Sequence, residues 1–429
     1  MKTQTIVVIT GALALGAAAA ACGGTAGGTA DNLFTGGAGG AGNASGAGGS
    51  AGASVGGGGA SGGGLNIGGA AGGGGGGTTC TAGPTEDQDQ DGFTIQDGDC
   101  NDCDANANPG AYDVANNQVD EDCNGTPDDT PTDCDGAITD VADMDPMNGA
   151  RAIGLCQVAT PGDKKWGVLE AKWVAADGSP LNPAHDNGHG LLTAFGPNVN
   201  CQEGKRMLGL SSGTARQPTD PGYQGVNGYS SGVKSACPTG FPIESPSCSG
   251  AVSGNTANDP AGLELKIRVP TNAKSFSFNF NFYTYEWPNY VCTTFNDFFV
   301  ALLNPATNAN PPQYANISFD TQGNPVSVNN AFLEACNPTI GATNPGGKNF
   351  PCTLGVAILQ GTGFDNDHAA TGWLETVAPI TPGSEMILRY AVWDAGDHIL
   401  DSSVLVDNFK FSADQASNTP TTKPVPTPK

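Results

Sequence analysis

Three aspartates stand at alternate positions, Asp87, Asp89 and Asp91, directly before Gly92. In a D-x-D-x-D-G loop the first, third and fifth residues point oxygen atoms at one cation, and the glycine lets the chain turn sharply. The seventh position, Phe93 in this chain, contributes a backbone carbonyl oxygen in such loops. The spacing therefore predicts a calcium-binding loop.

The loop needs a closing ligand other than the glutamate that an EF-hand carries at position twelve, because Gly98 stands there. Asp97 and Asp99 flank that glycine, and we expect one of them to complete the ligand set. Residues 85–135 hold 16 of the 42 acidic side chains and no lysine or arginine. Such crowding of like charges requires a counter-charge, which a divalent cation would supply.

A second loop repeats the pattern further along the chain. Asp120, Asp122, Asn124 and Gly125 read D-x-D-x-N-G, and Asp128 stands at position nine, a usual ligand position. Hard carboxylate and carbonyl oxygens favour calcium over a transition metal. The alternative is a solvated acidic linker, but the intervening cysteines and an N-P-G-A-Y turn favour a fixed fold.

The same segment contains a C-x-x-C pair, Cys100 and Cys103, which could indicate zinc or redox chemistry. No histidine lies near it, no second C-x-x-C exists, and no strand–helix pattern surrounds it. A disulfide to Cys123 or Cys134 is therefore expected instead.

The stretch DQDQDGFTIQDGDCNDCDANANPGAYDVANNQVDEDCNGTPDD, residues 87–129, resembles the metal-binding repeat named after the copper-binding surface protein MopE. This copy has Asn116 where cysteine is common, and Cys103 is additional. The resemblance implies a metal site and names copper as an alternative cofactor to calcium. The residues themselves do not favour copper, because residues 83–134 contain neither histidine nor methionine.

The amino terminus has the features of an export signal. Lys2 precedes an alanine-rich apolar run that ends in A-A-A-C, so residues 1–21 are predicted as a signal peptide. Small residues before Cys22 resemble the lipobox of bacterial lipoproteins, although Ala19 stands where leucine is usual. The alternative is ordinary signal-peptidase cleavage. Gly23 is not the aspartate associated with inner-membrane retention, so we expect an outer-membrane, cell-surface lipoprotein of a Gram-negative bacterium.

Residues 22–82 are predicted to form a disordered tether rich in glycine, alanine and serine. Half of residues 22–77 are glycine, 28 of 56. Such a composition buries too little apolar surface to offset the entropy of ordering. As a random coil this segment would reach about 40 Å, which would lift the folded part off a membrane.

The chain has 13 cysteines, and lipidation of Cys22 would leave an even number for disulfides in an exported protein. The disulfide candidates are Cys80, Cys100, Cys103, Cys123, Cys134, Cys156, Cys201, Cys237, Cys248, Cys292, Cys336 and Cys352.

Strand patterns dominate residues 135–414. In KSFSFNFNF the aromatic residues Phe276, Phe278, Phe280 and Phe282 alternate with serine and asparagine, as in a strand with one buried face. Further strands are expected in LELKIRV, DFFVALL, LGVAIL, MILRYAVW and SSVLVDNFKF, and a short helix in NGARAIGLC. The predicted fold class is mainly β: an antiparallel β-sandwich, jelly-roll or lectin-like, preceded by a small disulfide-bonded, loop-rich metal-binding module (residues 83–134) and the glycine-rich tether. A Pro/Thr-rich tail, residues 415–429, is expected to be disordered.

Other residues of this body could carry chemistry. A second structural calcium could join the last two strands, and its candidate ligands are Asp394, Asp397, Asp401 and Asp407. G-L-S-S-G around Ser211 fits G-x-S-x-G, but no helical pattern follows it. His185 and His189 are four apart in a segment whose proline and glycines exclude a helix. The aromatic residues Tyr283, Tyr285 and Trp287 could stack on sugars, or could form the second face of a buried strand.

Four segments of the body, among them SFSFNFNFYTYEWPNYVCTTFNDFFVALL and HAATGWLETVAPITPGSEMILRYAVWDAGDHILDSSVLVDNF, resemble the choice-of-anchor L domain. The others are LSSGTARQPTDPGYQ and SFDTQGNPVSVNNAF. The resemblance implies a surface location and no established catalytic activity, and Cys22 would be the anchor.

The net charge of −25 argues against binding nucleic acid or an anionic membrane through charge. We therefore predict a non-catalytic, surface-tethered lipoprotein with a calcium-binding module and a β-sandwich that binds a glycan or a cell-surface protein. The alternatives are a scavenger of copper or calcium, and a carbohydrate-active enzyme, which would need a pair of acids in a groove.

Overall fold

The computed structural model describes residues 81–129, 133–306, 315–319, 323–329, 355–365 and 368–429. The predicted signal peptide, almost the whole tether, Cys22, Cys80, Cys336 and Cys352 lie outside these residues. No helix in the described part of the chain is long and apolar enough to cross a membrane.

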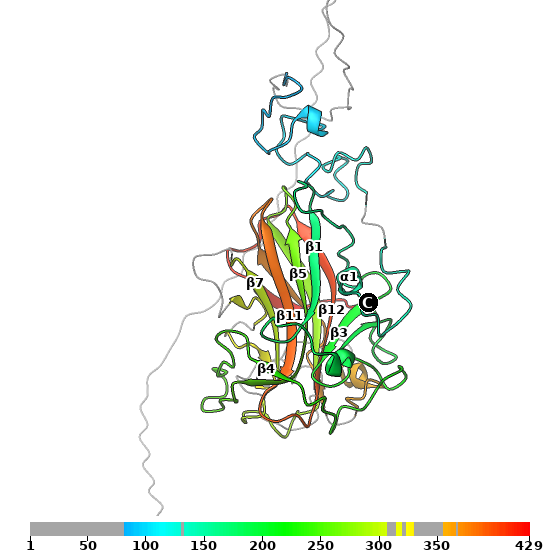
Figure 1. The fold of residues 1–429 in the computed structure, drawn as a ribbon, viewed down its shortest axis with the longest axis vertical. Helices are drawn as coiled ribbons and strands as arrows, with labels where there is room; N and C mark the ends of the chain where they lie inside the picture. Colours follow the sequence, from blue (N-terminus) through cyan, green and yellow to red (C-terminus); the bar gives the residue numbers. More distant parts are fainter. Residues whose placement is uncertain (1–80, 130–132, 307–314, 320–322, 330–354, 366–367) are drawn as a thin grey trace, which may run out of the picture. The chain divides into compact units, whose positions relative to one another are not determined.

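Two antiparallel sheets form the body, as the alternating patterns predict (Figure 1). The first sheet has the strand order β1-β5-β11-β7-β8, and β4 pairs with one part of β5. Its strands are β1 (Gly167–Val174), β4 (Lys234–Ala236), β5 (Thr256–Arg268), β7 (Phe298–Asn304), β8 (Val326–Ser327) and β11 (Glu385–Asp394).

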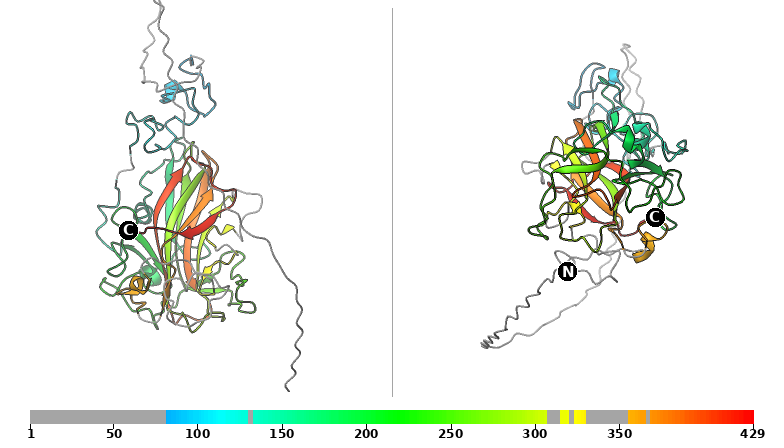
Figure 2. Two further views of the ribbon diagram at one scale, coloured as in Figure 1. Left: turned by 180° about the vertical axis from the view of Figure 1, so that it is seen from behind. Right: turned by 60° about the horizontal axis from the view of Figure 1, so that its bottom comes forward.

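The second sheet has the order β13-β10-β6-β12-β3-β2, and β9 pairs with β6. Its strands are β2 (His189–Leu192), β3 (Met207–Ser211), β6 (Ser275–Thr284), β9 (Ala369–Ala370), β10 (Leu374–Pro379), β12 (Ser402–Ser412) and β13 (Thr421–Pro424). The strands of both sheets run lengthwise through the body (Figure 2).

The main core lies between the sheets and is built on the aromatic stripe of β6. Phe276, Phe278, Phe280 and Phe282 are all buried in it. The ring of Phe278 meets that of Tyr390 edge-on at a centroid distance of 4.9 Å, so β6 packs against β11 of the other sheet. The prediction that this face of the strand points inward is confirmed, whereas the polar face is buried as well.

The opposite face of β6 is also covered. Tyr283 is buried in a second cluster, with its ring centroid 5.0 Å from that of Phe195 and 5.6 Å from that of Phe364. Trp287 follows the end of β6 and returns to the main core. Of the two interpretations of these aromatics, burial is correct for Tyr283 and Trp287.

The helical elements are short: α1 (Pro146–Arg151) and the 3-10 turns η1 (Ile95–Asp97), η2 (Pro183–Gly188) and η5 (Gly355–Leu359). The short helix predicted in NGARAIGLC corresponds to α1. The strand predicted in LGVAIL is wrong, because its described part forms η5; a short apolar run fits a buried turn as well as a strand.

The tail also differs from expectation, because Thr421–Pro424 forms β13 and pairs with β10. Thr422 explains part of this order, since its hydroxyl lies 2.9 Å from that of Thr376 on the neighbouring strand.

Three disulfides join Cys100 to Cys123, Cys134 to Cys156 and Cys248 to Cys292. Cys103 is disulfide-bonded as well. Cys201 and Cys237 carry free thiols, which corrects the expectation that they form disulfides. They cannot pair with each other, because each packs against a different apolar cluster.

Candidate metal centre

The first Asp-rich loop is shaped by its own carboxylates, which accept hydrogen bonds from nearby backbone amides. The amide of Gly92 donates to Asp87 Oδ2 at 3.1 Å, and the amide of Asp91 donates to Asp89 Oδ1 at 3.2 Å. The amide of Phe93 donates to Asp91 Oδ1 at 2.7 Å. Gly92 has a φ of 94°, which glycine adopts readily. The turn therefore gathers three carboxylates and uses one oxygen of each.

Two further aspartates complete this cluster. Oxygen atoms of Asp89, Asp99 and Asp102 lie within 4.8 Å of one another, as do oxygens of Asp87, Asp89 and Asp91. Asp99 was one of the two predicted closing ligands. Asp102 was missed, although it belongs to the same acidic run, because no calcium-loop position corresponds to it.

Four carboxylate oxygens in this cluster are buried and accept no hydrogen bond: Oδ2 of Asp89, Asp91, Asp99 and Asp102. Buried polar atoms in proteins almost always have a partner, and one divalent cation could serve several of these oxygens. Burial, with the nearby charges of Asp91 and Asp89, raises the pKa of Asp99 to about 6. The residues present fit a hard divalent cation such as calcium.

Asp97, the other predicted closing ligand, faces elsewhere. Its Oδ2 accepts a hydrogen bond from the Thr94 hydroxyl at 3.0 Å and lies 3.8 Å from Lys164 Nζ. The ring of Phe93 is buried and lies 5.0 Å from the same Nζ. Asp97 thus bonds Thr94, the N-cap of η1, and pairs with a lysine.

The second loop repeats the geometry of the first. The amide of Gly125 donates to Asp120 Oδ2 at 2.8 Å, and the amide of Asn124 donates to Asp122 Oδ1 at 3.1 Å. The amide of Thr126 donates to Asn124 Oδ1 at 2.8 Å. These bonds match those at equivalent positions of the first loop, so the repeat seen in the sequence is a structural repeat.

The acids around the second loop differ in part from those predicted. Oxygens of Asp113, Asp120 and Asp122 lie within 4.8 Å of one another, and Asp113 was missed. Asp128 instead accepts the amides of Asn117 and Gln118, at 2.7 and 3.0 Å.

The next residue, Asp129, accepts a hydrogen bond from the Asn124 side chain at 3.0 Å. The assignment of Asp128 as a ligand stays a prediction. Burial raises the pKa of Asp113 to about 6 and also raises that of Asp122.

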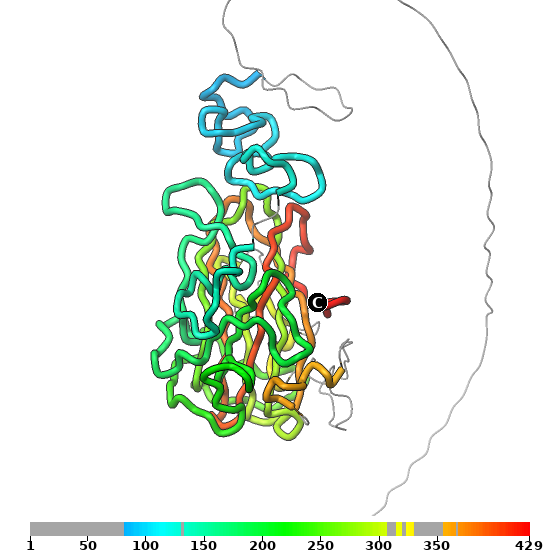
Figure 3. Tube along the Cα trace, turned by 90° about the vertical axis from the view of Figure 1, so that its right-hand side faces the viewer, coloured from blue at the N-terminus to red at the C-terminus, as the bar shows by residue number. Residues whose placement is uncertain are grey.

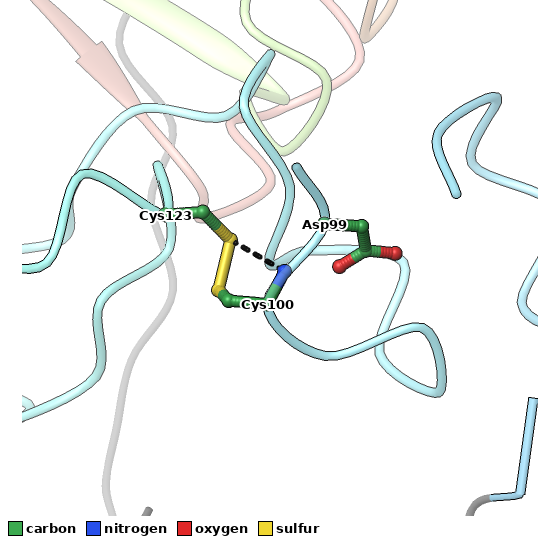
Figure 4. Close-up of side chains that lie close together, drawn as sticks. All are labelled: Asp99, Cys100 and Cys123. Carbon is green, nitrogen blue, oxygen red and sulfur yellow. Dashed lines mark hydrogen bonds between the residues drawn. A yellow bond between two sulfur atoms is a disulfide. The ribbon is translucent and has the colours of Figure 1, made fainter. Parts of the chain in front are cut away.

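The disulfide between Cys100 and Cys123 links the two loops (Figure 4). The amide of Cys100 donates to Cys123 Sγ at 3.1 Å, and the Asp99 side chain lies beside this disulfide. Both sulfurs are oxidised, so they offer no thiolate to a soft metal, although Asp99 and the two sulfurs lie within 4.8 Å of one another.

The N-P-G-A-Y turn between the loops binds the sandwich. Thr271 donates from its amide to the Gly110 carbonyl at 3.0 Å and from its hydroxyl to Asn108 Oδ1 at 2.8 Å. The side chain of Asn272 bonds the backbone amide and carbonyl of Tyr112, at 3.1 and 2.8 Å. Residues 81–129 run as successive tight loops without strands (Figure 3), so this turn is an important support for them.

The acids predicted near the last two strands do not form one group. Asp407 is buried and accepts the amides of Gln202 and Glu203, and burial raises its pKa to about 8. Asp397 accepts the amide of Ile399. Asp394 and Asp401 are buried near two other acids that the sequence reading missed, Glu286 and Asp297.

Burial and neighbouring charge also change the pKa values of these sandwich acids. Burial, with the charge of Asp297, raises the pKa of Asp394 to about 10. Burial, with the charge of Asp259, raises that of Asp401 to about 8. Burial raises the pKa values of Glu286 and Asp297 as well.

The remaining candidates for catalysis are structural. Ser211 ends β3, and its hydroxyl bonds the Ser402 carbonyl and the Ser403 hydroxyl. His185 Nε2 lies 3.1 Å from the Ser211 carbonyl oxygen, and His189 Nε2 lies 3.2 Å from that of Asp143. The imidazoles therefore bond separate backbone groups. Tyr285 stacks on His368 at a centroid distance of 3.4 Å.

The fold and the acidic loops define a class of protein: a β-sandwich preceded by a small acidic module. The family model of the choice-of-anchor L domain matches residues 181–412, more than half of the chain. The chain therefore belongs to the choice-of-anchor L family, whose domain is surface-associated and has no known enzymatic activity. A search of the curated proteins found no match.

Proposed function

We propose that this protein is a non-catalytic, surface-tethered binding protein whose residues 83–134 bind calcium, one ion in each Asp-rich loop. The observation that supports this best is the set of four buried carboxylate oxygens without partners in the first loop. A bound cation would satisfy them together and would offset the repulsion among the acids. Calcium binding thus contributes to the folding of the module.

Calcium is favoured over copper by the chemistry of the donors. The three cysteines of the loops, Cys100, Cys103 and Cys123, are in disulfides, and residues 83–134 have no histidine or methionine. The remaining donors are hard oxygens, which suit calcium. A copper-scavenging role would require soft ligands that this segment lacks.

A binding role is favoured over glycoside hydrolysis by the burial of the sandwich acids. A hydrolase needs two carboxyl groups facing a substrate in a groove. Glu286, Asp297, Asp394 and Asp401 are each at most 2% exposed. A sugar ring cannot reach such groups, so they suit a structural role. The partner that we propose for the sandwich is a glycan or a cell-surface protein, and a glycan array probed with and without calcium would identify it.

The proposed anchor is a lipid on Cys22 in the outer membrane of a Gram-negative bacterium. The supporting observation is the apolar run that ends in small residues and cysteine. A lipoprotein carries several acyl chains, and stable anchoring takes at least two. Cys22→Ala should release soluble protein or block processing. An unmodified residue 22 by mass spectrometry, or wild-type protein found wholly in the soluble fraction, would refute the anchor.

The calcium proposal is tested by two isosteric variants of neighbouring acids. Asp99→Asn removes a charge that faces the cluster, and Asp97→Asn removes one that faces Lys164. In calorimetric titration of the purified protein, we expect Asp99→Asn to weaken one calcium site at least tenfold, about 1.4 kcal/mol. Asp97→Asn should bind calcium like the wild type. Equal affinities for both variants, or tighter binding of copper than of calcium, would contradict the proposal.

A further inference from the structure

A second group of acids lies inside the sandwich, where strands of both sheets end. Glu286 follows β6, Asp297 precedes β7, Asp394 ends β11 and Asp401 precedes β12. Their exposed fractions are 2%, 0%, 1% and 2%. Among the residues that the structure describes, no lysine, arginine or histidine forms an ion pair with any of them.

The strand register places two of these acids directly opposite each other. Trp393 of β11 pairs with Phe298 of β7, and the amide of Asn296 donates to the Ala395 carbonyl at 2.9 Å. Asp394 and Asp297 occupy the intervening pair of positions. Side chains that oppose each other across antiparallel strands have Cβ atoms about 4.5–5.5 Å apart. Two carboxylates at that spacing repel each other unless a proton or a cation lies between them.

Successive side chains of a strand point to opposite faces, and this alternation turns two of the acids toward the space between the sheets. Tyr390 and Val392 of β11 belong to the main core, and Asp394 is the next residue of the same parity. Phe299 and Ala301 of β7 also belong to it, and Asp297 continues their parity.

On the other sheet, Glu286 follows the end of β6, and its amide donates to the Thr284 hydroxyl at 3.2 Å. Burial, with the charge of Asp394, raises the pKa of Glu286, and burial, with the charge of Glu286, raises that of Asp297, so the three carboxyl groups lie near one another. The two sheets therefore bring Asp297, Asp394 and Glu286 together at one end of the hydrophobic core.

Six oxygens of this group are buried and have no hydrogen-bond partner. They are both carboxylate oxygens of Asp297 and Asp394, Oε2 of Glu286 and Oδ2 of Asp401. Protonation alone would remove the charge but would leave most of these atoms unsatisfied in an apolar setting. One divalent cation satisfies several carboxylates at once, and hard oxygen donors select calcium.

We propose that a calcium ion binds between the two sheets at this end of the sandwich, with Glu286, Asp297 and Asp394 as ligands and Asp401 beside them. The oxygens of any three of these residues lie further apart than the 4.8 Å spacing seen in the module. Binding would draw them together and would tie β6 to β7 and β11. This site differs from the proposed one in residues 83–134 and does not depend on it.

The test uses a full-length variant in which Asp89→Asn and Asp122→Asn remove one predicted calcium ligand from each loop of the module. We call it the silenced variant. In calorimetric titration of this purified full chain with calcium, we expect one binding event to remain. Adding Asp394→Asn should abolish it or weaken it at least tenfold. Adding Asp163→Asn, which makes the same charge change at an exposed residue that accepts a hydrogen bond from the Lys165 amide, should leave it unchanged. Glu286→Gln serves as a second variant if Asp394→Asn does not fold by circular dichroism.

Terbium luminescence gives an independent measurement, because two buried tryptophans flank the ligands. Trp393 precedes Asp394, Trp287 follows Glu286, and both are fully buried. We expect tryptophan-sensitised terbium emission from the silenced variant and its loss in Asp394→Asn. The proposal is overturned if the folded, silenced variant binds no calcium, or if Asp394→Asn and Asp163→Asn behave alike. If only the module proposal fails, the wild type and the silenced variant titrate alike and the sandwich site remains.

Discussion

The acidic module and the β-sandwich are held together by different interactions. In residues 81–129 the buried apolar side chains are Phe93, Ala107 and Ala111. The sandwich instead buries a continuous core that includes the aromatic stripe of β6. Three apolar side chains cannot offset the entropy of ordering such a segment. Asp-to-amide hydrogen bonds, disulfides and the proposed ions must supply the difference.

The two regions also gather their carboxylates differently. The module collects acids that are neighbours in sequence, because each Asp–Gly turn brings together residues two to five positions apart. The sandwich collects acids that are far apart in the sequence, Asp297 and Asp394 through the pairing of β7 with β11, and Glu286 through the packing of the other sheet. The geometry of the module site thus depends mainly on local turns, whereas that of the sandwich group depends on the whole fold.

The largest effect should come from the sandwich core. Phe278 is fully buried against Tyr390, so Phe278→Ala removes a large side chain and leaves a cavity. We expect a loss of about 3–5 kcal/mol of stability, measured by denaturant unfolding of the sandwich. Added calcium should not restore it. Tyr290→Ala, at a partly exposed ring, is the control, and an equal loss there would contradict this account of the core.

The next effect should fall on the module. Replacing Cys100 and Cys123 together with serine opens a loop of 23 residues, and we expect the module to lose about 3 kcal/mol. Hydrogen exchange of residues 87–129 should rise while the exchange of β6 stays unchanged. If the exchange of β6 rises equally, the two regions unfold as one unit and the comparison fails.

Much of the fold could be predicted because its patterns are local. The alternation of aromatic with polar residues predicted β6, and the bounds of β7, β11 and β12 follow the apolar runs of the sequence. The failures are segments whose structure depends on distant contacts. Gly355–Leu359 reads as a strand but forms η5, and Thr421–Pro424 reads as a disordered tail but finds the free edge of β10.

The candidate sites divide in the same way. Asp87, Asp89 and Asp91 could be predicted because a turn fixes their spacing, whereas Asp102 and Asp113 could not, because no calcium-loop position corresponds to them. Asp297 and Asp394 are far apart in the sequence, so no spacing rule could predict that they lie together. Only the register of β7 with β11 places them opposite each other.

The pH dependence of calcium binding would sharpen the contrast between the acidic module and the β-sandwich. Asp99 and Asp113 have pKa values of about 6 without metal. Below that pH calcium must displace a proton from each loop, so affinity should fall as the pH is lowered from 7.5 to 5. If calcium displaces one proton at each site, its affinity falls about tenfold over this pH range, which corresponds to about 1.4 kcal/mol.

The stability of the metal-free module should change in the opposite sense. A carboxyl group whose pKa is raised by folding contributes stability below its unfolded value, and loses that contribution as the pH rises through 6. Calorimetric titrations at several pH values check the predicted fall in calcium affinity, and unfolding of the metal-free protein at the same pH values checks the predicted change in stability. Asp99→Asn should flatten the profile of the first loop, and an unchanged profile in that variant would assign the proton to another group.

The smallest effect should come from Lys164, which joins the two regions at the surface. Its amine donates to the Gly92 carbonyl, lies 5.0 Å from the centre of the Phe93 ring and lies 3.8 Å from Asp97 Oδ2. Lys164→Gln should cost the module less than about 1 kcal/mol, because the ammonium group is largely solvated and the attraction is screened. Hydrogen exchange of residues 87–99 at low and high salt measures it, with Lys165→Gln as the matched control. A loss that persists at high salt, or an equal loss in Lys165→Gln, would show that this contact does not couple the module to the sandwich through charge.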